Sequence, residues 1–288
     1  MNTVLFAGYP RSGNTLLGQT LNHAGGIHGA PYDIYQLRRE RLTPSPNPIF
    51  RSEICSIKTH DSWRPFRDFH SLYFGSVLKV VVITRNPFDT LLSSINFFRI
   101  LYLQGGNELS PLARYSLTKL IPDFQIKNSF LADFKLAKLR DGGMLDIALQ
   151  NFGESGTVIS NFYTMTGTWS DFSSSYDYSG VDVLKISYEE LEAISIRSAE
   201  TNDYISPALS KLSSFLDVDS ALLRKGFSIQ RRDALAIKEA KSEVKFFNEG
   251  SSGYWKNYFS AKACRSFMDL HYPAIARNGY EHLISEID

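Results

Sequence analysis

The sequence predicts an α/β fold in which helices flank a central parallel β-sheet. Four short apolar runs are rich in β-branched residues and too short to be core helices, which is typical of strands buried inside a sheet. Helix-like stretches follow two of these runs, and a repeated strand-loop-helix order indicates a parallel sheet. No internal repeat and no sharp change of composition divides the chain, so we expect one domain over residues 1–288.

The expected elements follow one another simply along the chain. The predicted strands are Thr3–Ala7, Ile54–Lys58, Lys79–Thr84 and Val183–Ser187. The first strand leads into a helix over Asn14–His23, which the pair Gly25-Gly26 ends, and the third leads into a helix over Phe88–Ile100. A further helical region is expected from about Pro207 to Lys245. The stretch from about 105 to 179 mixes aromatic residues with glycine, and we interpret it as insertions that wrap a pocket.

Composition and charge argue against several classes of protein. With 43% hydrophobic and 21% charged residues, the 288-residue chain has the balance of an ordinary globular protein. Its net charge of +1 argues against a broadly basic nucleic-acid-binding surface. The two cysteines, Cys55 and Cys264, show no metal-ligand spacing, so no metal site is predicted.

The cysteine count and the first residues bear on location. Two cysteines suit a reducing compartment. No apolar run reaches the roughly 20 residues that a membrane span requires, and no basic leader precedes the first apolar run. We therefore expect a cytoplasmic protein without a membrane partner. The sequence leaves the oligomeric state open.

A phosphate-binding loop is the strongest motif, at Gly8-Tyr-Pro-Arg-Ser-Gly-Asn-Thr15. It follows a predicted strand and opens a predicted helix, where backbone N–H groups form an anion site. The spacing of the loop matches that of P-loop nucleotide triphosphatases, so the fold is expected to be P-loop nucleotide-binding-like. Asn14 stands where those proteins carry lysine, and the positive charge lies earlier in the loop. A glycine-rich turn without a ligand has the same local pattern. The predicted phosphate-binding residues are Arg11, Ser12, Gly13, Asn14 and Thr15.

A second anion-binding pattern spans the strand and helix from Lys79 to Ser93. Arg85 ends the strand, and Asp89 and Ser93 are four residues apart, so they share a face near the start of the helix. A guanidinium and a hydroxyl near a helix N-terminus suit a phosphate. In the alternative interpretation, Arg85 pairs with a carboxylate and Asp89 caps the helix.

A candidate general base, His60, follows the second predicted strand. In open parallel sheets, ligands bind beyond the carboxyl ends of the strands, where the phosphate loop and Arg85 are also expected. Histidine titrates near neutral pH, which suits removal of a proton from a hydroxyl. A lone histidine is also common as a core or surface residue.

These motifs resemble those of the cytosolic-type sulfotransferases, which use 3′-phosphoadenosine-5′-phosphosulfate (PAPS). The first loop is similar to the family's 5′-phosphosulfate loop, Y-P-K-S-G-T-T, with Arg11 for the lysine and Asn14 for the first threonine. The second is similar to the 3′-phosphate motif R-N-x-x-D-x-x-x-S, whose arginine and serine hold that phosphate. The matching residues are Arg85, Asn86, Asp89 and Ser93.

Two further stretches carry the resemblance. Lys58-Thr-His60 matches the family's K-T-H, which implies His60 as the general base and Lys58 as a contact of the transferring group. Ser187–Leu191 is similar to Y-E-D-L, which implies that Tyr188 helps to hold the adenine.

Near the carboxyl end, the stretch from Asn248 to Phe259 resembles R-K-G-x-x-G-D-W-K-N-x-F. It implies a donor contact at Gly250 and, just before the loop, an adenine contact at Phe246. Asn248-Glu249 replaces the basic pair that clamps the 3′-phosphate in the family. The cations that we consider as substitutes are Arg224, Lys225, Arg231 and Arg232; such a charge run is also typical of a solvated face.

The resemblance implies a diverged PAPS-dependent sulfotransferase acting on a small-molecule hydroxyl or amine, with the 105–179 insertions around the acceptor. His60, Lys58 and Arg11 are the predicted catalytic residues. A bacterial source and a natural-product tailoring role are expectations that accompany the divergence. A P-loop kinase or nucleotide hydrolase is the alternative enzyme, and a nucleotide-binding module without activity is the alternative outside catalysis.

Overall fold

The computed structural model describes residues 2–26, 29–51, 53–74, 76–103, 115, 117–121, 136–155, 166–201, 203–239 and 252–287. The chain forms two compact units. The first comprises Met1–Arg85 and Ser175–Lys241, and the second comprises Asn86–Ser174 and Ser242–Asp288.

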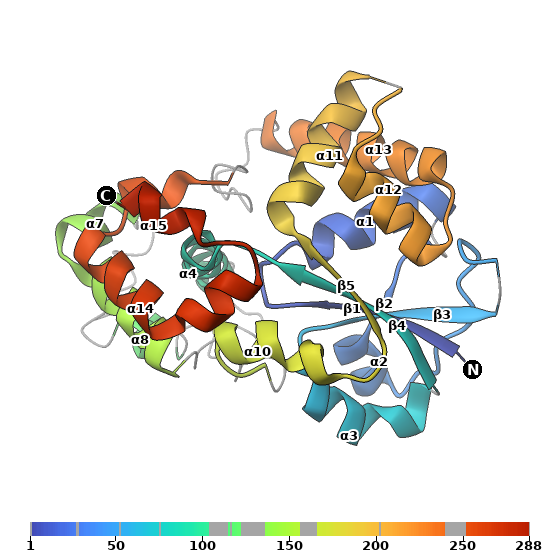
Figure 1. Cartoon of the computed structure of the whole chain (residues 1–288), viewed down its shortest axis with the longest axis horizontal. Helices are drawn as coiled ribbons and strands as arrows, with labels where there is room; N and C mark the ends of the chain where they lie inside the picture. The colour runs from blue at the N-terminus through green and yellow to red at the C-terminus, as the bar shows by residue number, and fades with distance from the viewer. Residues whose placement is uncertain are drawn as a thin grey trace. The chain divides into compact units, whose positions relative to one another are not determined.

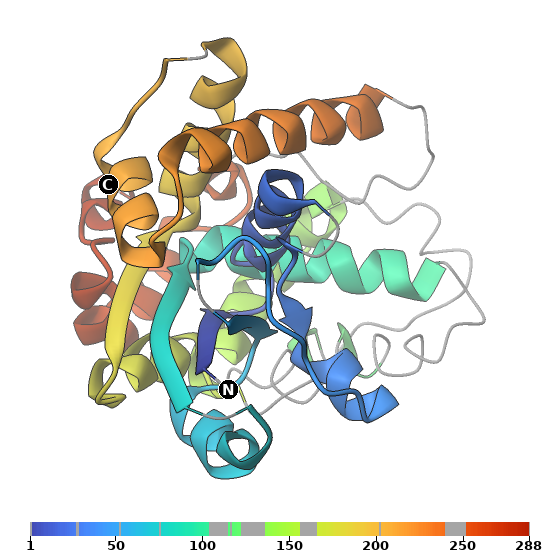
Figure 2. The ribbon, with the colours of Figure 1, turned by 90° about the vertical axis from the view of Figure 1, so that its right-hand side faces the viewer.

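A five-stranded parallel sheet is the centre of the first unit, with the strand order β2-β3-β1-β4-β5. The predicted α/β class with a central parallel sheet is therefore confirmed. Figure 2 shows β4 and β5, in teal and yellow, running side by side. The strands are β1 (Asn2–Gly8), β2 (Tyr32–Asp33), β3 (Ile54–Thr59), β4 (Ser76–Thr84) and β5 (Asp182–Ser187).

The short strand β2 is the one element of the sheet that the sequence pattern did not predict. Its two residues are only partly buried, and two residues are too few to produce an apolar run. It pairs with β3 so that Asp33 lies opposite Lys58.

Helices cover both faces of this sheet (Figure 1). On one face lie α1 (Asn14–Gly25), α11 (Tyr188–Glu200), α12 (Pro207–Leu216) and α13 (Ser220–Glu239). On the other face lie α2 (Ile34–Glu40) and α3 (Trp63–Phe74). A short 3₁₀ helix, η2 (Tyr176–Tyr178), precedes β5. The central strands are apolar toward both faces of the sheet: β1 and the second half of β4 are buried almost continuously. This burial agrees with their sequences, in which apolar and polar residues do not alternate.

The strand order places β1 between β3 and β4, so the chain leaves β1 toward one edge and later crosses to the other. Such a reversal opens a crevice at the carboxyl ends of the central strands, where ligands bind in folds of this class. The loops after β1, β3 and β4 begin at this edge, and they carry the phosphate loop, His60 and Arg85.

The second unit is helical in its described part. It contains α4 (Pro87–Leu103), α7 (Leu136–Asp141), α8 (Met144–Ser155), most of α10 (Trp169–Ser175), η3 (Tyr254–Asn257), α14 (Ala261–Arg277) and α15 (His282–Ile287). Aromatic rings form its core: the ring of Phe88 lies 4.7 Å from that of Trp255 and 5.5 Å from that of Phe267. None of the helices in the described ranges is long and apolar enough to cross a membrane.

Candidate functional site

The loop after β1 has the geometry of an anion-binding turn. The N–H of Ser12 donates to Tyr9 O (2.9 Å), and Arg11 and Gly13 adopt positive φ angles of 70° and 107°. Helix α1 begins at the next residue, with no side-chain cap and no acidic residue in its first turn. Because the first N–H groups of a helix have no partner within the helix, this end attracts an anion.

Ser12 adds a second indication of a ligand at this turn. Its side chain is fully buried, and its Oγ has no hydrogen-bond partner in the part of the chain that the structure describes. A buried hydroxyl without a partner is costly, so such groups usually mark a missing water or ligand. The turn and this hydroxyl together suit a phosphate-like group.

Arg85, which directly follows strand β4, contacts this turn. Its guanidinium donates to Arg11 O (2.9 Å) and stacks over the ring of Tyr188 at 4.2 Å from the ring centroid. Tyr188 begins α11 after β5 and packs against the turn, because a Cβ added to Gly13 would lie 2.8 Å from its ring. Burial raises the pKa of Tyr188 in spite of the adjacent Arg85 cation, so the ring is a neutral platform.

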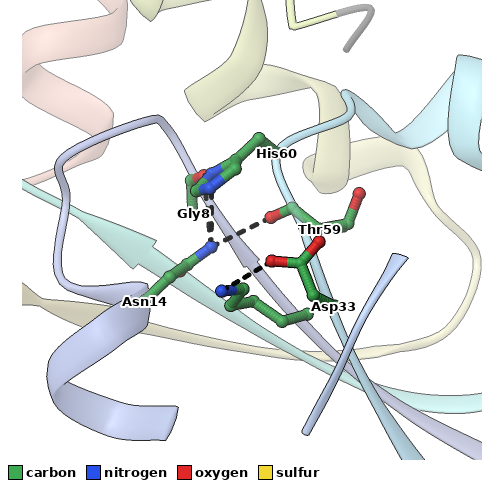
Figure 3. A network of polar contacts seen from close by, with 6 residues as sticks. Gly8, Asn14, Asp33, Thr59 and His60 are labelled. Atoms are coloured by element: carbon green, nitrogen blue, oxygen red, sulfur yellow. Dashed lines mark hydrogen bonds and ion pairs between the residues drawn. The ribbon is translucent and has the colours of Figure 1, made fainter. Parts of the chain in front are cut away.

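His60 lies directly beside the carbonyl end of β1 (Figure 3). Its Nδ1 is 2.6 Å from Gly8 O, and the Nδ2 of Asn14 is 3.3 Å from the same nitrogen. A carbonyl oxygen can only accept, so the short contact assigns the proton to Nδ1. This tautomer places the imidazole lone pair on Nε2, the form in which histidine accepts a proton.

Asn14 completes this corner with its side-chain amide. Its Nδ2 donates to Thr59 O (3.0 Å) and reaches Gly8 O at 3.5 Å (Figure 3). The amide is therefore engaged by the ends of β1 and β3, and donating to a phosphate would require these bonds to be given up. A Cβ at Gly8 would overlap the Asn14 amide, so a larger residue there would displace that side chain from the ends of β1 and β3.

Burial is the main influence on His60 and lowers its pKa. The hydrogen bond to Gly8 acts in the opposite direction, the Lys58 cation lowers the pKa further, and the carboxylates of Asp33 and Asp61 raise it. The net lowering keeps the imidazole neutral at neutral pH, which is the state a general base needs.

A short network holds the chain on which His60 lies. The N–H of Asp61 donates to Thr59 Oγ1 (3.0 Å), and the hydroxyl of Tyr176 donates to Asp61 O (2.6 Å). Tyr176 is fully buried, and burial raises its pKa well above the ordinary value. No sequence pattern indicates this support, because Tyr176 lies in the stretch interpreted as insertions and nothing local distinguishes it.

Lys58 forms an ion pair with a residue that the sequence analysis did not consider. Its Nζ lies 2.7 Å from Oδ2 of Asp33. The two residues are opposite each other on β3 and β2. No sequence pattern marks Asp33, because only the pairing of these two strands brings it to Lys58.

The second half of the R-N-x-x-D-x-x-x-S motif lies in the second unit. The α4 cap is Asn86, whose Oδ1 accepts from the N–H of Phe88 (2.9 Å). Asp89 is fully buried and accepts the N–H groups of Gly253 (2.6 Å) and Trp255 (3.3 Å). Asp89 thus anchors the segment that contains Gly253 and Trp255.

Replacing Asp89 with asparagine is expected to lower the free energy of unfolding by about 1–3 kcal/mol. The amide keeps only one acceptor oxygen, so one of the two loop N–H groups then faces an NH₂ group. Asp146→Asn is the matched control, because Asp146 accepts a single N–H, from Ser260 (2.9 Å), at an exposed site. Thermal unfolding measures both variants, and equal losses would contradict the anchoring role of Asp89.

Several predicted site residues lie apart from this cluster. Thr15 is on α1 and exposed, and Ser93 is on α4, partly buried, in the second unit. Phe246, Gly250 and the pair Asn248-Glu249 lie outside the described residues. The candidate substitute cations, each at least partly exposed, lie on α13: Arg224, Lys225, Arg231 and Arg232.

The two cysteines and the candidate metal ligands complete the account of the described ranges. Both cysteines are buried free thiols, and burial raises the pKa of Cys264 to about 12 and also raises that of Cys55. Within the described residues, no three His, Cys, Asp or Glu side chains gather in a way that would hold a metal ion.

The sheet and the anion turn between its first strand and first long helix define the P-loop-like class of α/β proteins. Within that class, the chain is similar to the crystal structure of mouse sulfotransferase SULT7A1 complexed with PAP. The two are 18% identical with a TM-score of 0.53, over 99% of this chain and 87% of that chain. This likeness establishes a sulfotransferase-like fold. No protein-family model matches the sequence, and no curated protein does.

Proposed function

We propose that this protein is a sulfotransferase that moves the sulfuryl group of PAPS to a hydroxyl or amine of a small molecule. One observation carries the proposal: a neutral histidine with its lone pair on Nε2 lies next to an anion-binding turn. The pairing suits a reaction in which a proton leaves the acceptor while negative charge passes to a phosphate. The mouse sulfotransferase with the similar fold is complexed with PAP, which supports a bisphosphorylated adenosine as the ligand of this protein.

In the proposed reaction, His60 takes the proton of the acceptor as its oxygen or nitrogen attacks the sulfur. A bond forms between that atom and sulfur, the bond from sulfur to the 5′-phosphate oxygen breaks, and adenosine 3′,5′-bisphosphate leaves with the electron pair. In this proposal, the first N–H groups of α1, Ser12 and Arg11 stabilise the developing charge on the leaving phosphate, which is supported by the uncapped start of α1 and the buried Ser12 hydroxyl. Holding donor and acceptor in line supplies much of the remaining rate enhancement.

Arg85 and Tyr188 are the proposed contacts of the nucleotide beyond the 5′-phosphate. Their stacked side chains stand beside the turn, and a guanidinium with an aromatic ring suits a phosphate and a base. Ser93, Phe246 and Gly250 remain predicted donor contacts. Lys58 remains a predicted contact of the transferring group, which would have to compete with Asp33 for its ammonium.

Incubation with PAPS labelled in its sulfuryl group and a panel of phenols, alcohols and amines tests the proposal. We expect at least one acceptor to gain one labelled sulfuryl group, measured by mass spectrometry, with release of adenosine 3′,5′-bisphosphate. A panel without any labelled product would contradict the enzymatic proposal and favour a binding module. The screen narrows the choice of small-molecule acceptor, whereas a cytoplasmic location and a natural-product role are further parts of the proposal.

A binding measurement separates the proposal from the kinase or nucleotide hydrolase alternative. Adenosine 3′,5′-bisphosphate at about 100 times its Kd should raise the free energy of unfolding by about 2.7 kcal/mol. ATP with Mg²⁺ should not, because Asn14 replaces the P-loop lysine and is engaged by Gly8 and Thr59. Stabilisation by ATP with Mg²⁺ alone would favour the alternative.

A further inference from the structure

The ion pair between Lys58 and Asp33 lies two residues before the candidate base along the chain. Lys58 and His60 are two residues apart at the end of β3, and Asp33 ends β2 directly opposite Lys58. The Nζ to Oδ2 distance is 2.7 Å, and the two side chains are 24% and 36% exposed. A pair shielded to this degree feels less screening than one on the open surface.

The length of β2 supports a specific purpose for this pair. The strand consists of Tyr32 and Asp33, and it pairs with β3 at Ile57 and Lys58 alone. So short an edge strand contributes little to the sheet, yet it delivers one carboxylate to the residue two positions before His60.

The charged groups that shift the His60 pKa include the Lys58 cation and the carboxylates of Asp33 and Asp61. Asp61 is already committed, since it is buried and its Oδ2 accepts from the hydroxyl of Thr59 at 3.3 Å. The Lys58 cation opposes protonation of the imidazole, and Asp33 is the group in contact with that cation. The Asp33 carboxylate therefore offsets the charge that would otherwise weaken the base.

We propose that Asp33 is a positioning residue for the transfer reaction: it holds the Lys58 ammonium at the end of β3 and offsets its charge, so that His60 stays basic enough to accept the acceptor's proton. The assignment rests on the proposed function for its place in catalysis. The effect of Asp33 on the protonation of His60 is a property of the folded protein and can be measured without turnover.

The test is an NMR titration of the His60 imidazole, one of six histidines, assigned by the resonance lost in His60→Gln. Asp33→Asn should lower the His60 pKa, because the Lys58 charge is left uncompensated. Lys58→Met should raise it, because the opposing cation is gone while Asp33 remains. The double variant should return toward the wild-type value, and Asp33→Glu should restore it.

Lys185 and Asp177 provide the matched control. They form an ion pair in the same unit with similar exposure, 26% and 24%, but they lie on β5 and η2 rather than on the strands that carry Asp33 and Lys58. Asp177→Asn and Lys185→Met should leave the His60 titration unchanged. An unchanged or raised His60 pKa in Asp33→Asn, or the same shift in Asp177→Asn, would overturn the role of Asp33.

Steady-state kinetics of the same variants test whether the Lys58–Asp33 ion pair affects turnover. The acid limb of kcat/KM should move to lower pH in Asp33→Asn and to higher pH in Lys58→Met, following the His60 pKa. Asp33→Asn should also lower kcat by about 10–100-fold, the order of loss for a misplaced group, with affinity for adenosine 3′,5′-bisphosphate unchanged. A wild-type protein that transfers no sulfuryl group contradicts the proposed function, whereas absent NMR shifts contradict the role of Asp33; the two failures are separate.

Discussion

Replacing His60 with glutamine is expected to lower kcat for sulfuryl transfer by roughly 10²–10⁴-fold, the usual contribution of a general base. Glutamine can still donate from its amide to Gly8 O, so the corner formed with Asn14 is kept while the titratable group is lost. Affinity for adenosine 3′,5′-bisphosphate should therefore change little. Steady-state kinetics and calorimetric titration measure the two quantities separately.

The same role of His60 predicts the direction in which the pH dependence of activity is shifted. Because burial lowers the His60 pKa, the wild-type acid limb should lie below the ordinary histidine range, with full activity at neutral pH. The limb should vanish in His60→Gln. His271→Gln is the matched control, since burial also lowers the pKa of His271, whose Nδ1 lies 2.6 Å from Ser170 Oγ in the second unit. Unchanged turnover in His60→Gln with intact bisphosphate binding would refute the base assignment.

Gly13→Ala is the variant expected to damage donor binding most. At a φ of 107° an alanine is strained by about 1–3 kcal/mol. Its Cβ would also lie 2.8 Å from the Tyr188 ring, so the turn or the ring must move. Losing one charge-assisted hydrogen bond to the phosphate, worth about 1.5–3 kcal/mol, should weaken bisphosphate binding roughly 10–100-fold.

Gly180→Ala separates backbone strain from displacement of the ring. Gly180 has a φ of 72° in the same unit, and nothing lies within 4 Å of an added Cβ. Thermal unfolding should therefore show a loss in both variants, whereas calorimetry should show weakened bisphosphate binding in Gly13→Ala alone. Equal affinities in the two alanine variants would remove the turn at Gly13 from the donor site.

The local patterns of the sequence were sufficient for the sheet and for the place of the site. Apolar β-branched runs predicted β1, β3, β4 and β5. The apolar residues are continuous in β1 and in the second half of β4, because strands buried on both faces need apolar residues at every position, whereas β5 at the edge of the sheet is only partly buried. In a parallel sheet, the carboxyl ends of neighbouring strands lie at one edge, so the phosphate loop, His60 and Arg85 were expected together there. The contacts of His60 with Gly8 and of Arg85 with Arg11 confirm that proximity.

Partners distant in sequence were beyond those patterns. Motif matching treated Lys58 and Asn14 as donors to the transferring group and the phosphate, yet both are engaged within the protein, by Asp33 and by the ends of two strands. For Asp89 the sequence suggested a helix cap, and the structure shows that its carboxylate accepts the N–H groups of Gly253 and Trp255. Each outcome depends on which chain segment packs against the residue.

The sequence by itself thus determined the class of fold, the tight turn after β1 and the place of His60 at the end of β3, because periodicity and turn chemistry act over a few neighbouring residues. Tertiary structure alone decided the protonated nitrogen of His60, the pairing of Lys58 with Asp33 and the stacking of Arg85 on Tyr188. These depend on strand pairing and on burial, which set hydrogen-bond partners and local charge only after the chain has folded.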